Sequence, residues 1–173
     1  MRASQDDLYQ DAVDAFGPAL HRLARAYEAD AEKRRDLSQD ILFQLWRSFR
    51  TWDAQCSMRT WVYRVAHHVA VSHVVRERRI FAALVSLEEL DALQDQVAEP
   101  DSPDRQLNLD RLSTLIQRLK PLDRQVIISY LEDLDAAEIA EITGLSPANV
   151  AMRVHRIKRV LAKQFHQGVQ DAG

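Results

Sequence analysis

The chain has 173 residues, of which 46% are apolar and 28% are charged, and its formal net charge is −3 at pH 7. This apolar content is enough to build a core, which excludes wholesale disorder, and the length fits one domain or two small ones. The longest apolar run, residues 80–85, is far short of the roughly 20 residues that span a bilayer, and no signal segment is present. We therefore expect a cytoplasmic protein without membrane insertion of its own.

Several chemical classes are excluded by residue counts. Cys56 is the only cysteine, so neither an intrachain disulfide nor a CxxC zinc site can form. The four glycines are scattered, whereas a loop that holds phosphates needs them clustered. His67, His68 and His73 are spaced so that they fall on different faces of a helix. We expect no metal site and no cofactor.

The charge is distributed unevenly along the chain. Residues 1–80 carry a net charge of +2, residues 81–107 carry −6, and residues 108–173 carry +1. The middle segment also contains Pro100 and Pro103, and its composition is typical of a linker. The sequence therefore predicts two domains, 1–80 and 108–173, joined by an acidic linker over residues 81–107.

Apolar residues recur at helical spacing throughout, and no segment alternates with a period of two, so the fold class is all-α. The first domain is predicted to be a bundle of three to four helices, with helices near residues 4–27, 33–49 and 57–79. Ser4 and Asp7 resemble a capping box, and Gly17-Pro18 can bend the first helix. The residues expected to face inward are Leu8, Ala12, Phe16, Leu20, Leu23, Tyr27, Leu37, Ile41, Leu45, Phe49, Val62, Val65, Ala66 and Val69.

The second domain is predicted to have four helices. One contains Leu109 to Leu119, and the next begins near Pro121. Asp135 and Glu138 form a capping box for a short helix that ends at Gly144, and Ser146-Pro147 begins the last helix. Two helices joined by a three-residue turn are typical of a helix-turn-helix, whose second helix enters the major groove of DNA.

The last helix has an apolar face and a basic face. Residues 146–167 contain five Lys or Arg and no acid, a pattern that suits contacts to phosphates and guanine edges. A tight helical hairpin without a DNA-binding role would show the same caps and apolar spacing, but its exposed face would normally mix both charges. The candidate DNA-binding residues of this helix are Asn149, Met152, Arg153, His155, Arg156 and Arg159.

Two stretches together resemble a known family. DLSQDILFQLWRSF (residues 36–49) followed by SMRTWVYRVAHHVAVSH (57–73) is similar to conserved region two of the extracytoplasmic-function (ECF) sigma factors of bacteria. Residues 119–165 resemble region four of the same family. The two stretches stand in the family's order, with a linker between them. The resemblance implies a promoter-specificity subunit of RNA polymerase without catalytic chemistry.

The resemblance also implies partners and sites. The first domain would dock on the β′ clamp of core RNA polymerase and capture the melted minus-ten element. The second would bind the β flap and read the minus-thirty-five element of promoter DNA. An anti-sigma factor would control the chain and could hold it at the inner face of the membrane. The polymerase-binding candidates are Asp36, Gln39 and Asp40, and the minus-ten candidates are Arg59, Thr60, Trp61, Tyr63, Arg64, His68, Ser72, Arg76 and Arg79.

Some of these roles have alternatives. Trp61 and Tyr63 are spaced so that they can equally belong to the core of the first domain. A one-component regulator, with a ligand-binding domain attached to a dimeric helix-turn-helix, is the alternative to a sigma factor. A ligand pocket, however, needs neither a basic and aromatic third helix nor an acidic linker. An enzyme is disfavoured because no nucleophile, carboxylate pair or metal cluster converges in the sequence.

Overall fold

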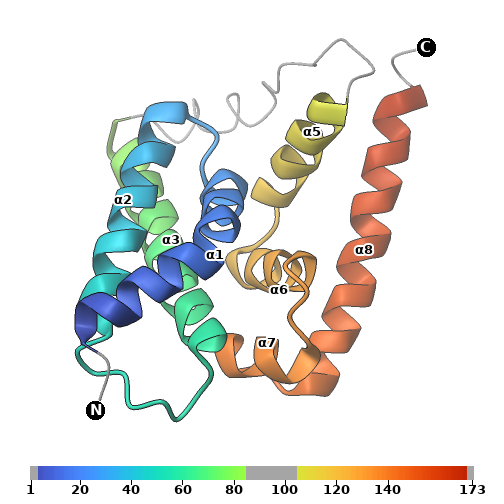
Figure 1. The fold of residues 1–173 in the computed structure, drawn as a ribbon. Helices are drawn as coiled ribbons and strands as arrows, with labels where there is room; N and C mark the ends of the chain where they lie inside the picture. The colour runs from blue at the N-terminus through green and yellow to red at the C-terminus, as the bar shows by residue number, and fades with distance from the viewer. Residues whose placement is uncertain (1–3, 85–104, 171–173) are drawn as a thin grey trace.

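The structure is a computed structural model that describes residues 4–84 and 105–170. These residues form seven helices and no strands: α1 (Gln5–Tyr27), α2 (Ala31–Ser48), α3 (Met58–Leu84), α5 (Arg105–Gln117), α6 (Pro121–Leu131), α7 (Ala136–Thr143) and α8 (Pro147–Gln170). The all-α prediction is confirmed. Figure 1 shows α1, α2 and α3 gathered on one side of the molecule and α5 to α8 on the other. None of the described helices is long and apolar enough to cross a membrane.

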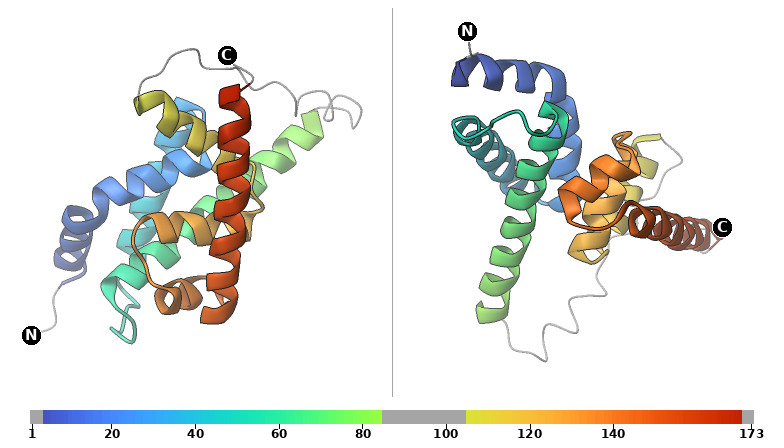
Figure 2. Two further views of the ribbon diagram at one scale, coloured as in Figure 1. Left: turned by 90° about the vertical axis from the view of Figure 1, so that its right-hand side faces the viewer. Right: turned by 90° about the horizontal axis from the view of Figure 1, so that it is seen from below.

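The three helices of the first domain pack around one apolar core. Ser4 caps α1 as predicted: its hydroxyl accepts from the Asp7 amide, and the Asp7 carboxylate accepts from the Ser4 amide. Pro18 lies inside α1, where it removes one backbone hydrogen bond, and Figure 2 shows α1 bending along its length. Leu23, Leu37 and Leu45 are fully buried between these helices.

The second domain contains the predicted helix-turn-helix in α7 and α8. Asp135 accepts hydrogen bonds from the first turn of α7, and Glu138 accepts from the Asp135 amide, which completes the capping box. Gly144 ends α7 with a φ of 76°, a conformation that costs glycine little. The apolar face of α8 is buried through Val150, Val154, Ile157 and Leu161.

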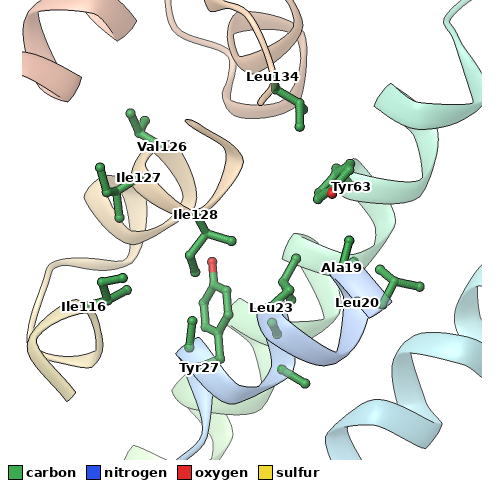
Figure 3. Packing of buried hydrophobic residues seen from close by; sticks show 14 of the residues in the cluster. Ala19, Leu20, Leu23, Tyr27, Tyr63, Ile116, Val126, Ile127, Ile128 and Leu134 are labelled. Carbon is green, nitrogen blue, oxygen red and sulfur yellow. The ribbon is translucent and has the colours of Figure 1, made fainter. Parts of the chain in front are cut away.

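The two domains are packed against each other. α7 and α6 lie on α3, and α5 lies on α1. Their buried residues belong to a single cluster, and Figure 3 shows Tyr27 of α1 pointing toward Ile128 of α6. Arg124 of α6 also lies over the ring of Tyr27, with its guanidinium carbon 5.2 Å from the ring centre.

Two details differ from the sequence predictions. Val65 and Val69, which were expected to face the core, pack against it but are only partly buried, whereas Val62, Ala66 and Ala70 of the same helix are fully buried. α3 also continues to Leu84 and α5 begins at Arg105, so helix extends into both ends of the predicted linker. The rest of that acidic linker lies outside the described residues.

Candidate nucleic-acid interface

A groove runs along the surface between α2 and α3. Its volume is about 700 Å³, and it is lined by residues of both helices. Five of the predicted minus-ten residues line it together: Trp61, Arg64, His68, Ser72 and Arg76. They recur every three or four residues, which places them along one face of α3. Gln44, Ser48, Val65, Val69 and His73 also line the groove, and the sequence did not point to them as groove residues.

The groove combines flat rings with charge. The Trp61 indole donates to the Ser48 hydroxyl at 2.9 Å, which fixes the ring against α2 while leaving the side chain partly exposed. His68 is exposed and lines the same groove about two turns farther along α3. At the other end, Arg76 lies 3.7 Å from the Asp40 carboxylate, and both side chains are more than half exposed. A pair this exposed is weak, so Arg76 can exchange Asp40 for a phosphate.

Four other predicted minus-ten residues lie outside this groove. Thr60 is buried and exchanges hydrogen bonds with Ser57 at the beginning of α3. Tyr63 is buried toward the second domain, and burial raises the pKa of its hydroxyl. Arg59 also contacts the second domain, whereas Arg79 is exposed farther along α3.

The predicted polymerase-binding residues share an exposed face of α2. Asp36, Gln39 and Asp40 are all exposed. Phe43 and Trp46 follow on the same helix, 54% and 36% exposed, with their rings stacked at 6.4 Å. Exposed aromatic rings of this kind are enriched at protein interfaces. These two rings were not predicted from the sequence, although Phe43 follows Asp40 by three residues and Trp46 follows Gln39 by seven, spacings that place both on this face.

The predicted minus-thirty-five residues line the outer side of α8. Asn149, Met152, His155, Arg156 and Arg159 are exposed, while Arg153 is half-buried at the edge of this face. The Asp123 carboxylate of α6 accepts hydrogen bonds from the guanidinium groups of Arg153, at 2.6 Å, and Arg156, at 3.1 Å. Nothing in the sequence indicated this role for Asp123, because it lies 30 residues before Arg153.

The histidines of α3 have separate environments. His67 is fully buried, and burial lowers its pKa to about 3. Nε2 of His73 is hydrogen-bonded to the Glu28 carboxylate at 2.9 Å, and His68 lines the groove. Across residues 4–84 and 105–170, no three histidine, cysteine, aspartate or glutamate side chains group as metal ligands.

Comparisons with known proteins identify the family. The model described as Sigma-70 region 2 matches residues 12–80, and the model described as Sigma-70, region 4 matches residues 109–161. The ECF RNA polymerase sigma factor SigW of Bacillus subtilis is 22% identical over 173 residues, with 95% of this chain and 92% of SigW covered. RNA polymerase sigma factor YlaC of the same organism is 27% identical over 172 residues, with 98% of this chain and 96% of YlaC covered.

A solved structure has the same fold. The sigma factor RpoE in complex with the anti-sigma factor NepR, from Bartonella quintana, aligns with a TM-score of 0.69 at 18% identity, covering 92% of this chain and 96% of RpoE. The two sigma-70 models together match more than half of the chain, and the relatives match it almost from end to end. The chain belongs to the extracytoplasmic-function sigma factors and is a sigma subunit of RNA polymerase.

Proposed function

We propose that this sigma factor binds core polymerase at two places, the β′ clamp through α2 and the β flap through its second domain. The groove of α3 captures the melted minus-ten strand, and α8 reads the minus-thirty-five element. The single observation that carries the proposal is the groove itself. It brings an indole ring, an imidazole and two guanidinium groups to one exposed surface, beside the acidic face of α2.

The groove suits single-stranded DNA for physical reasons. A melted strand offers unstacked bases and a backbone of negative charge. Aromatic rings and guanidinium planes stack on bases, and cationic groups hold phosphates. Trp61 is fixed by its bond to Ser48, so little entropy is lost when a base stacks on it. Arg64 and Arg76 stand on either side of His68 along the same wall.

The outer face of α8 suits duplex DNA. Its N-terminal residues are the ones that reach base edges in a helix-turn-helix, and here Asn149, Met152 and Arg156 are exposed. Asparagine and arginine can each form bidentate bonds, to adenine and guanine respectively. Asp36 and Asp40, exposed on α2, can accept charge-assisted hydrogen bonds from a basic helix of the polymerase.

We also propose that an anti-sigma factor controls this chain in the cytoplasm, where such a partner could hold it at the inner membrane face. The support is the likeness in fold to RpoE, whose solved structure contains the anti-sigma factor NepR. Like its relatives, this protein would act by binding and carry out no catalysis of its own.

The test is run-off transcription with core polymerase and genomic DNA fragments. We expect promoter-dependent initiation only when this chain is added. His68→Ala should then lower open-complex formation, measured by permanganate reactivity of unpaired thymines. His21→Ala is the matched control, because His21 is exposed on α1 and does not line the groove. Equal open-complex yields from both variants would contradict the assignment of the groove.

A further inference from the structure

We infer that Asp6, in the first turn of α1, is a positioning residue for polymerase binding. It holds the Trp46 indole on the exposed face of α2, where the ring can serve as an apolar anchor beside the carboxylates of Asp36 and Asp40. The contact between Asp6 and Trp46 is present in the structure. Its consequence for polymerase rests on the proposed function of α2.

Two side chains from the first turn of α1 reach Trp46 on the neighbouring helix. The indole Nε1 of Trp46 donates to Oδ1 of Asp6 at 2.8 Å, and the Gln5 side-chain amide donates to the Trp46 backbone carbonyl at 2.8 Å. One bond fixes the ring, and the other fixes the backbone that carries it. Because the acceptor is a carboxylate, the bond to the indole is charge-assisted and stronger than a bond to a neutral oxygen.

The cap of α1 leaves Asp6 available for this bond. The neighbouring aspartate, Asp7, exchanges hydrogen bonds with Ser4 and so completes the capping box of the helix. Asp6 takes no part in that box, and its carboxylate accepts from Trp46 instead. The two adjacent aspartates therefore have separate tasks, one in capping the helix and one in orienting the ring.

Trp46 is part of an exposed stack on α2. Phe43 lies about one turn earlier, with the two ring centres 6.4 Å apart and the ring planes inclined by 26°. The guanidinium carbon of Arg47 lies 5.8 Å from the centre of the Phe43 ring. These contacts continue from the bond to Asp6. An indole held in place gives Phe43 a fixed surface to stack on, so one hydrogen bond helps to order both rings.

The stack continues the acidic face of α2. Asp36, Asp40 and Phe43 recur at spacings of four and three residues, which places them on one face of the helix, and Trp46 follows Phe43 by three more. This face offers carboxylates at one end and stacked rings at the other. It fits a polymerase helix on which basic residues, which pair with the carboxylates, are followed by aliphatic residues, which pack on the rings. Tryptophan is among the residues that contribute most to such interfaces.

Holding the indole in advance strengthens binding. A side chain that is free to rotate loses conformational freedom when a partner orders it, whereas one that is already held loses little. Without the Asp6 acceptor, the Trp46 ring can turn away from Phe43 and must be ordered by the polymerase. We therefore expect loss of this acceptor to weaken polymerase binding roughly five- to tenfold.

The test measures the affinity of the full chain for core polymerase by biolayer interferometry. Asp6→Ala removes the acceptor and should raise Kd roughly five- to tenfold. Asp6→Asn keeps an oxygen that can accept from the indole, so it should recover most of the affinity although the charge is gone. Asp11→Ala is the matched control, because it removes the same charge from an exposed position of α1 and should bind like wild type. Equal losses from Asp6→Ala and Asp6→Asn would show that Asp6 acts through its charge, which would overturn the inference.

A double-mutant cycle tests whether Asp6 acts through Trp46. Trp46→Phe keeps an aromatic ring but has no N–H to donate. In this background Asp6→Ala should cause no further loss of affinity, and losses that multiply would overturn the inference. The ring itself is followed in the free chain by NMR, where Trp46→Phe assigns the Nε1–H resonance. This proton should exchange with solvent faster in Asp6→Ala but not in Asp11→Ala.

The outcomes separate this inference from the proposed function. If Asp6→Ala frees the indole proton but binds polymerase as tightly as wild type, while Asp36→Lys/Asp40→Lys abolishes binding, Asp6 is not a positioning residue and α2 remains the docking face. If the charge reversal on α2 also leaves binding intact, the proposed function of α2 fails and the inference fails with it.

Discussion

Nη2 of Arg156 donates to both carboxylate oxygens of Asp123, at 3.1 Å each, and Arg153 donates to the same carboxylate at 2.6 Å. Asp123 is largely buried, whereas Arg156 is 60% exposed. One carboxylate therefore fixes the position of two guanidinium groups and neutralises part of their charge. Arg156 still has other N–H donors for a partner. A guanidinium held in this way loses less conformational freedom when it binds a base.

Arg156→Ala should weaken binding to the minus-thirty-five duplex and relax specificity at one base pair. A bidentate contact to guanine is worth roughly 1–3 kcal/mol of discrimination. The measurement is fluorescence anisotropy with the cognate duplex and its single-base variants. Equal loss on every sequence would instead mark Arg156 as a phosphate contact.

Asp123→Asn should have the opposite effect on non-specific DNA. It leaves two arginines without their shared counter-charge, so affinity for scrambled duplex should rise and its salt dependence should steepen. The ratio of cognate to scrambled affinity should fall, because Arg156 is no longer held in place. The comparison variant is Asp133→Asn, which makes the same charge change away from α8. Identical affinity ratios for the two variants would show that Asp123 does not position the arginines.

Asp36→Lys/Asp40→Lys should abolish co-purification with core polymerase. Both residues are exposed, so the helical circular dichroism should not change. Like charges placed together at an interface cost several kcal/mol, which corresponds to roughly 100-fold or more in affinity. Asp11→Lys/Asp14→Lys is the control, with the same change in net charge on the exposed side of α1. Retained binding by the α2 variant, or equal loss by the control, would contradict the assignment.

The sequence was sufficient for most of the fold because local signals agree with the packing. The capping box of Asp135 and Glu138 and the left-handed Gly144 both lie where the residue pattern predicted them. Val65 and Val69, which were predicted to face the core, pack at its edge for a physical reason. α3 packs on α2 with one face and on the second domain with another, so a single apolar stripe does not describe it.

The site was predictable only where its residues are close in sequence. The wall of the groove, from Trp61 to Arg76, lies on one helix, and its spacing was visible. Arg22 and Glu132 are separated by 110 residues, and both resemble ordinary surface charges. Their pairing depends on how two domains meet, which no local pattern encodes.

His67 makes the stability of the first domain depend on pH. Its imidazole is fully buried between Tyr27 and Ser129, and burial lowers its pKa from 6.5 to about 3. Below pH 6.5 the unfolded chain takes up a proton that the folded chain excludes. The contribution of His67 is therefore complete above pH 6.5 and is lost as the pH falls toward 3.

The expected loss is about 1.4 kcal/mol per pH unit, or about 2 kcal/mol between pH 6.5 and pH 5. Urea unfolding followed by tryptophan fluorescence will measure it, because Trp46, Trp52 and Trp61 all belong to the first domain. His67→Gln keeps an uncharged polar group at the site and should remove this part of the pH dependence. His21→Gln, at an exposed position, should retain it. Parallel stability profiles for wild type and His67→Gln would show that His67 is protonated in the folded protein, against the burial seen here.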